Sequence, residues 1–199
     1  MGFTTILDIL GSTIIGGLLI LTLMRLQDNS VDQQITWGHD KILQDEISNL
    51  ATTIEEDFRK MGYCADPSQI VDTTILIVFA DTSSLKYRSD LDNNGTLEYI
   101  HYYLGPVSEL SFTPNPRDRI LYRKINNEIP LIISNNITDL QFRYYDTFKN
   151  ELSTPVSNTK LIEALQITFK VEDPDAYDED YSSAFWSQLR LTSRNLRKR

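Results

Sequence analysis

The stretch ILDILGSTIIGGLLILTLM, residues 6–24, decides the fold of this chain. It is apolar almost throughout, and its one charged residue is Asp8. As an α-helix rising about 1.5 Å per residue, a run of this length crosses a hydrocarbon layer roughly 30 Å thick. The sequence therefore predicts a transmembrane helix over residues 1–25, and hence a protein attached to a membrane.

The flanks of this run favour a retained anchor over a cleaved signal. A secretory signal peptide begins with basic residues and ends at a small-residue cleavage site, whereas no Lys or Arg precedes Arg25. A myristoylation signal would place Ser or Thr at position 6, where this chain has Ile6. We therefore expect a single-pass anchor.

The helical period continues beyond the membrane segment, over residues 26–63. Apolar side chains recur at steps that keep them on one helical face, with polar and charged residues between them. The apolar positions are Ile35, Ile42, Ile47, Leu50, Ile54, Phe58 and Met61. We expect one helix from about residue 4 to residue 61, ended by Gly62, because glycine tolerates a left-handed backbone.

Residues 64–199 form a different region of short β-branched and aromatic runs, which are typical of strands. The predicted strands cover residues 74–79, 85–88, 97–104, 119–125, 129–133, 140–145, 165–171 and 185–192. Asn94-Gly95 predicts a two-residue hairpin loop, because this dipeptide supplies positive φ at low cost, and Asn126-Asn127 predicts a second turn.

These patterns together predict an α+β fold. An amphipathic helix must cover its apolar face, and the nearest surface is one face of the predicted sheet. We therefore expect a long membrane-spanning and then amphipathic helix packed on an antiparallel β-sheet, with one β-rich domain over residues 64–199.

Five segments carry a family resemblance. The first is IEEDFRKMGY (54–63), at the C-terminal end of the helix that begins at Gly2-Phe3. The other four are LKYRSDLDNNGTLE (85–98), RILYR (119–123), ITDLQFRYYD (137–146) and LTSRNL (191–196). In content and order they resemble the type IV pilin family, closest to its large W-type minor pilins and to the J-type pseudopilins of type II secretion.

The resemblance implies processing and assembly roles for residues near the N-terminus. A prepilin peptidase would cut after Gly2 and leave a methylated Phe3 as the mature start. The family carries glutamate at the fifth mature position, where it pairs with a neighbour's terminal amine. Here that position is Leu7, and the carboxylate stands one residue later at Asp8, about 100° further around the helix. Asp8 either pairs in this way or reaches the headgroups near the helix end.

The implied function is that of a non-enzymatic minor pilin or pseudopilin, which primes or caps a type IV pilus-like or type II secretion filament. Its expected partners are other pilins or pseudopilins, a prepilin peptidase and the membrane. The expected location is the inner membrane, with the C-terminal domain outside the cytoplasm or in the filament. The alternative is a membrane-anchored extracytoplasmic binding module, with or without calcium as a cofactor.

The candidate metal site is the loop that contains Asp90, Asp92 and Asn94, with Glu98 close behind. Alternating carboxylate and amide oxygens before a glycine resemble the first half of an EF-hand loop, and calcium takes six to eight such oxygens. The twelfth position is His101 instead of a bidentate glutamate. Two interpretations stay open: a calcium site, or a tight turn with solvated acids.

Catalytic and nucleic-acid-binding patterns are missing from the sequence. There is no phosphate loop, zinc spacing or nucleophile elbow, and the chain holds two histidines, His39 and His101, and the single Cys64. The net charge of −9 opposes general affinity for nucleic acid, because phosphate binding needs clustered Lys and Arg. We expect no enzyme activity and no nucleic-acid partner.

Overall fold

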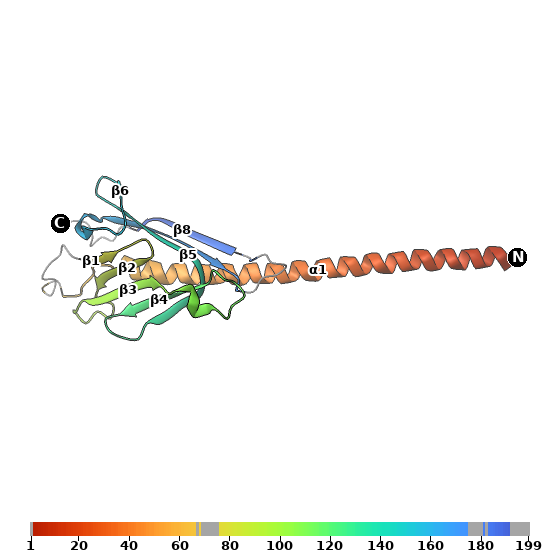
Figure 1. Ribbon diagram of the computed structural model, residues 1–199, viewed down its shortest axis with the longest axis horizontal. Helices are drawn as coiled ribbons and strands as arrows, with labels where there is room; N and C mark the ends of the chain where they lie inside the picture. The colour runs from red at the N-terminus through yellow and green to blue at the C-terminus, as the bar shows by residue number, and fades with distance from the viewer. Residues whose placement is uncertain (1, 67, 69–75, 175–180, 182, 192–199) are drawn as a thin grey trace. The chain divides into compact units, whose positions relative to one another are not determined.

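The chain forms one long helix followed by an antiparallel β-sheet (Figure 1). This computed structural model describes residues 2–66, 68, 76–174, 181 and 183–191, without the side chains of residues 3, 4 and 188–191. The chain divides into two compact units, residues 1–41 and 42–199. The predicted α+β class, with a long N-terminal apolar helix and an antiparallel sheet, is confirmed.

The helix α1 spans Gly2–Arg59 without a break. Residues 60–62 form a turn after it, and Gly62 has a φ of 72°, the left-handed conformation predicted for the residue that ends the helix. The Gly62 N–H donates to the carbonyl of Arg88 over 2.8 Å. The helix exit is therefore fastened to the sheet through its glycine.

The sheet is antiparallel, with the strand order β1-β2-β3-β4-β5-β7-β8 and β6 paired to β5. The strands are β1 (Ile77–Ala80), β2 (Ser84–Ser89), β3 (Glu98–Leu104), β4 (Arg119–Ile125), β5 (Leu131–Tyr145), β6 (Glu151–Leu152), β7 (Ala164–Glu172) and β8 (Ser183–Leu191). Two short 3₁₀ helices, η2 (Val107–Leu110) and η3 (Thr159–Leu161), lie in the connections.

The sheet curls so that its β1 end meets the far end of β5. The Phe142 N–H donates to the carbonyl of Thr82 over 2.7 Å, and the Tyr144 hydroxyl donates to the carbonyl of Asp81 over 2.8 Å. The Val156 N–H reaches the carbonyl of Ala80, at the end of β1, over 2.9 Å. These bonds satisfy backbone groups that an open edge would leave unpaired.

The C-terminal part of α1 supplies one side of the core of residues 42–199 (Figure 1). Its buried apolar side chains are Leu43, Ile47, Leu50, Ala51, Ile54 and Phe58, followed by Met61. Phe58 is 1% exposed and meets the rings of Tyr87 and Tyr102 edge-on, with centroids 5.6 and 5.3 Å away. Such buried aromatic contacts bind the helix to β2 and β3.

The prediction that Ile35 and Ile42 belong to the buried apolar face of the helix is wrong. Ile42 is 66% exposed and Ile35 is 39% exposed. Steps of three and four residues back from Ile54 and Ile47 lead to Leu43, and Ile42 lies about 100° away from it around the helix. Leu43, at 3% exposure, takes the core position instead.

Two local predictions in the sheet are also corrected. The loop between β2 and β3 runs over residues 90–97, so Asn94-Gly95 does not form a two-residue hairpin. Positive φ falls at Asn93 and Gly95. Residues 131–133 and 140–145 of two predicted strands belong to the single strand β5. The pairing of β5 with β4 and with β7 contains register shifts, as at a β-bulge. The turn at Asn126 is confirmed, with a φ of 48° and a Glu128 N–H to Ile125 carbonyl bond.

Candidate functional site

The first candidate site is the apolar surface of the N-terminal part of α1. Large apolar side chains between Ile6 and Leu26 are 55–64% exposed. An 18-residue window of the helix has a mean hydropathy of 2.1 and no buried residue. By length and composition this helix can cross a membrane, and the structure is compatible with a single membrane anchor.

Hydroxyl groups in this segment are already satisfied by the helix itself. Thr13 donates to the carbonyl of Ile9 over 2.7 Å, and Thr22 donates to the carbonyl of Leu19 over 2.8 Å. In hydrocarbon an unpaired hydroxyl is costly, so these bonds make the segment suitable for a lipid environment.

The three predicted N-terminal residues lie in the first turns of α1. Gly2 begins the helix, and Phe3 follows it with a side chain outside the described part. Asp8 is exposed two turns into the helix. The processing and assembly roles of these residues stay predictions.

The second candidate site is the loop between β2 and β3. One carboxylate oxygen from each of Asp90, Asp92 and Glu98 lies within 4.8 Å of the others. Three of the four residues that the sequence predicted for a metal site therefore have carboxylates that lie close together in the fold. Asn94 lies in the same loop, but its Nδ2 donates to Asp92 over 2.8 Å and its Oδ1 accepts from the Thr96 N–H over 2.7 Å.

Hydrogen bonds inside this loop already engage the carboxylates. Asp90 accepts from the backbone N–H groups of Ala65, Asn94 and Gly95 at 2.9–3.1 Å. The Ala65 N–H, followed by those of Gly95 and Asn94, holds the pKa of Asp90 below its ordinary value, against the burial that would raise it. Glu98 accepts from the Leu91 N–H over 3.0 Å. The arrangement stabilises a tight loop, and its remaining oxygen lone pairs have the chemistry for a hard divalent cation.

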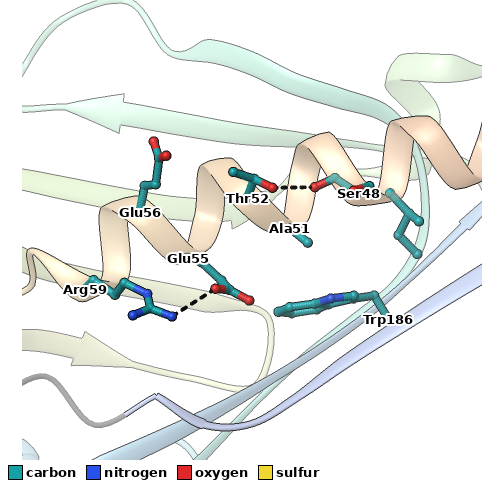
Figure 2. Close-up of a pocket in the computed structure, with 8 residues that line it drawn as sticks. Ser48, Ala51, Thr52, Glu55, Glu56, Arg59 and Trp186 are labelled. Atoms are coloured by element: carbon teal, nitrogen blue, oxygen red, sulfur yellow. Dashed lines mark hydrogen bonds and ion pairs between the residues drawn. The ribbon is translucent and has the colours of Figure 1, made fainter.

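A groove of about 450 Å³ runs along α1 beside β8 (Figure 2). Trp186 forms its aromatic wall, and Figure 2 shows the indole facing Ala51 and Glu55. Glu55 pairs with Arg59 over 3.4 Å along the helix. The other lining residues are Ile47, Ser48, Thr52 and Glu56, so the groove combines apolar and polar side chains.

The helix is also held to the sheet by a buried ion pair that sequence reasoning missed. The Arg123 Nε lies 2.5 Å from the carboxylate of Asp57, and the Tyr102 hydroxyl donates to the same carboxylate over 2.6 Å. Burial and the nearby Asp57 charge raise the pKa of Tyr102. Asp57 and Arg123 are 66 residues apart, so no local pattern pairs them.

A second polar cluster lies where the loop before β4 meets the end of β7. Glu172 accepts hydrogen bonds from Lys170 over 2.6 Å, Arg117 over 2.7 Å and the Asn115 amide over 3.0 Å. Burial alone would raise its pKa, but these donors, Lys170 foremost, lower it to about 2. Glu172 therefore links the loop before β4, through Asn115 and Arg117, to the end of β7.

Asp118 lies beside this cluster in a less favourable environment. It is fully buried, and neither carboxylate oxygen has a hydrogen-bond partner among the residues that the structure describes. The nearby Thr113 hydroxyl bonds to the carbonyls of Leu110 and Asn115 at 2.8 and 3.3 Å. Burial raises the pKa of Asp118 to about 6, with Thr113 opposing the shift and Glu172 adding to it.

The residues with catalytic potential are dispersed in the described part of the chain. Cys64 is buried at the helix exit, where its thiol lies 3.2 Å from the Asp66 carbonyl, and His39 lies on α1. His101 Nε2 lies 2.9 Å from the Ser84 hydroxyl. A serine nucleophile needs a base that becomes cationic, whereas burial and the charges of Lys86 and Lys124 lower the pKa of His101. This pair therefore lacks the electrostatics of a catalytic dyad.

No protein-family model matches the sequence, and no curated protein matches it. The resemblance to type IV pilins thus rests on the quoted segments alone.

Proposed function

We propose that this chain is a non-enzymatic subunit of a type IV pilin-like filament, a minor pilin or pseudopilin that primes or caps a pilus-like or type II secretion assembly. The observation that carries the proposal is α1, one unbroken 58-residue helix with an exposed apolar N-terminal part and a C-terminal part packed on an antiparallel sheet. Such an apolar surface must be covered by lipid or by other helices. A subunit that leaves the bilayer exchanges the first cover for the second.

The proposal includes an inner-membrane location, with the sheet domain outside the cytoplasm, and other pilins and a prepilin peptidase as partners. Gly2 and Phe3 are the proposed processing site. Asp8 is the proposed assembly residue, because a carboxylate within an apolar helix is costly unless it is paired or lies near the interface.

Two measurements on protein from its native membrane test this function. Mass spectrometry should show a mature chain that lacks residues 1–2 and carries a methylated Phe3. Sheared filaments should contain the protein, and Asp8→Ala should deplete it there while the matched acidic control Asp28→Ala leaves its amount unchanged. An intact N-terminus together with a protein confined to the membrane fraction would refute the filament role.

The second candidate function is a permanently anchored binding module that uses calcium. The observation that favours it is the convergence of Asp90, Asp92 and Glu98 within 4.8 Å. An intact N-terminus, together with a calcium-dependent rise in melting temperature that Asp92→Asn removes, would support this role over the first.

A further inference from the structure

The outer face of strands β2, β3 and β4 carries a compact group of aromatic and basic side chains. We call it the β2–β4 face, and its members are Lys86, Tyr99, His101, Tyr103, Tyr122 and Lys124. The intervening residues Leu85, Tyr87, Ile100, Tyr102 and Leu121 are buried in the core. Because side chains alternate along a strand, the β2–β4 face points away from that core.

Basic side chains gather on this face, although the chain as a whole has a net charge of −9. Lys86 pairs with His101, and His101 pairs with Lys124, so one row crosses three strands. Neighbouring strands lie about 4.8 Å apart, which places the two lysine backbones roughly 10 Å from each other. Arg88 adds a further cation, since it lies on the same side of β2 and donates to the Tyr99 hydroxyl over 2.8 Å.

In the described part of the chain, the acidic side chain bonded to this face is Glu109, at its margin. Glu109 accepts from the Tyr122 hydroxyl over 2.9 Å, and its charge contributes to the raised pKa of Tyr103, which burial chiefly causes. Lys86 lies over the Tyr99 ring, with Nζ 5.1 Å from the centroid. Among the described residues no acidic side chain pairs with Lys86 or Lys124, so these two lysines present positive charge in a chain with a net charge of −9.

The aromatic rings restrict the kind of anion that fits. The His101 ring lies tilted by 34° against Tyr103 with centroids 4.7 Å apart, and Tyr103 stacks on Tyr122 at 5.2 Å. Lys86 and Arg88 cover Tyr99 at 5.1 and 5.0 Å. Nucleic-acid bases need free ring faces for stacking, and contacts among these side chains occupy part of the ring surfaces. A long polyanion would also experience the repulsion of the acidic remainder of the chain.

We propose that the β2–β4 face docks an acidic segment of a partner protein, whose carboxylates lie between Lys86 and Lys124. A local cluster of carboxylates pairs with the lysine row and extends little into the acidic surroundings. Phe79 is 44% exposed and pairs with Lys86, and Ile132 is 55% exposed and pairs with Tyr122, so both flank the β2–β4 face and supply apolar contacts. Tyrosine, other aromatic residues and arginine are enriched at protein interfaces. This inference does not depend on the filament function.

The test measures binding of a fluorescent oligoglutamate peptide to the full chain in zwitterionic detergent at low ionic strength. Each exposed charge pair contributes at most about a fivefold change in affinity, so Lys86→Gln/Lys124→Gln should weaken binding by roughly 5- to 25-fold. The control Lys149→Gln/Lys160→Gln removes the same charge from the β5–β6 connection and from η3, and it should leave the affinity nearly unchanged.

A second readout locates the bound peptide at the row itself. Burial, Lys86 and Lys124 lower the pKa of His101, so carboxylates placed between the lysines should raise it. The ring-proton resonance reports this pKa, and His101→Gln identifies it against that of His39. Equal losses in both double variants, or an unchanged His101 pKa at saturation, would overturn the proposal. Tighter binding of a single-stranded oligonucleotide of equal charge, lost in Lys86→Gln/Lys124→Gln, would overturn it in favour of a nucleic-acid surface.

Discussion

The ion pair between Asp57 and Arg123 should account for a measurable share of the docking of α1 on the sheet. The Asp57 side chain is 13% exposed and that of Arg123 is 16% exposed. Breaking a buried pair by removing one partner costs about 3–5 kcal/mol, because the other charge is left buried. Since both side chains keep some exposure, we expect about 2–3 kcal/mol for Arg123→Met, which retains most of the apolar stem.

Asp57→Ala should cost about 1 kcal/mol more, because the Tyr102 hydroxyl then also loses its acceptor in the core. Removing both partners leaves no orphaned charge, so the double variant should lose less than the sum of the single variants. We expect a coupling energy of about 2 kcal/mol.

Urea unfolding of the full chain in detergent, followed by tryptophan fluorescence, gives the four free energies of unfolding in this cycle. The matched control is the exposed pair of Glu55 and Arg59 on the same helix, 3.4 Å apart. Glu55→Ala and Arg59→Met should couple by only about 0.3 kcal/mol. Additive losses at Asp57 and Arg123, or a coupling no larger than in the control, would refute the reasoning.

Three further predictions concern carboxylates. Asp118→Asn should stabilise the protein by about 1–2 kcal/mol at pH 7. The pKa of Asp118 in the folded protein, about 6, lies above its ordinary value, so ionisation of this carboxyl lowers stability as pH rises from about 4 to 6. Melting temperatures measured at pH 4 and pH 7 should show the gain at pH 7 alone. Glu172 has a pKa of about 2 in the folded protein, so it stabilises the fold above its ordinary pKa, and this contribution is lost as pH falls from about 4.5 to 2. In Glu172→Gln the free energy of unfolding should therefore depend less on pH between about 4.5 and 2. An unchanged pH dependence would contradict this. If the β2–β3 loop binds calcium, millimolar calcium should raise the melting temperature, and Asp92→Asn or Glu98→Gln should abolish the rise, whereas magnesium should not replace calcium.

The helix could be predicted from sequence because its signals are local and repeated. Nineteen residues without a proline and with one charge, and then an apolar face over Ile47, Leu50, Ile54 and Phe58, satisfy one period throughout. The error at Ile42 arose where the apolar face has neighbouring candidates, Ile42 and Leu43, and only packing on the sheet distinguishes them.

The loop after β2 shows how a local signal can be outweighed by distant contacts. Asn94-Gly95 favours a two-residue turn. However, the Asp90 carboxylate accepts hydrogen bonds from the Gly95 N–H in the same loop and from the Ala65 N–H after the helix. These bonds open an eight-residue loop between the strands, residues 90–97. Convergence of the carboxylates could be anticipated from their spacing, whereas their hydrogen-bond partner at Ala65 could not.

The β2–β4 face had a readable signal that the strand prediction did not use. Tyr99, His101 and Tyr103 alternate with Ile100 and Tyr102. Because side chains alternate along a strand, these two sets lie on opposite faces of the sheet. Which set faces the core depends on α1, because Phe58 meets Tyr102 there.

Polar contacts define the register of α1 on the sheet in a way that its apolar face does not. Sliding the helix by one turn would replace one apolar side chain by another, since Ile47, Leu50, Ile54 and Phe58 follow each other at turn spacing. The same slide would separate Asp57 from Arg123 and Glu46 from the Asn136 amide, now 2.9 Å apart. A misplaced buried carboxylate costs more than a misplaced methyl group, so these contacts select one register among similar ones.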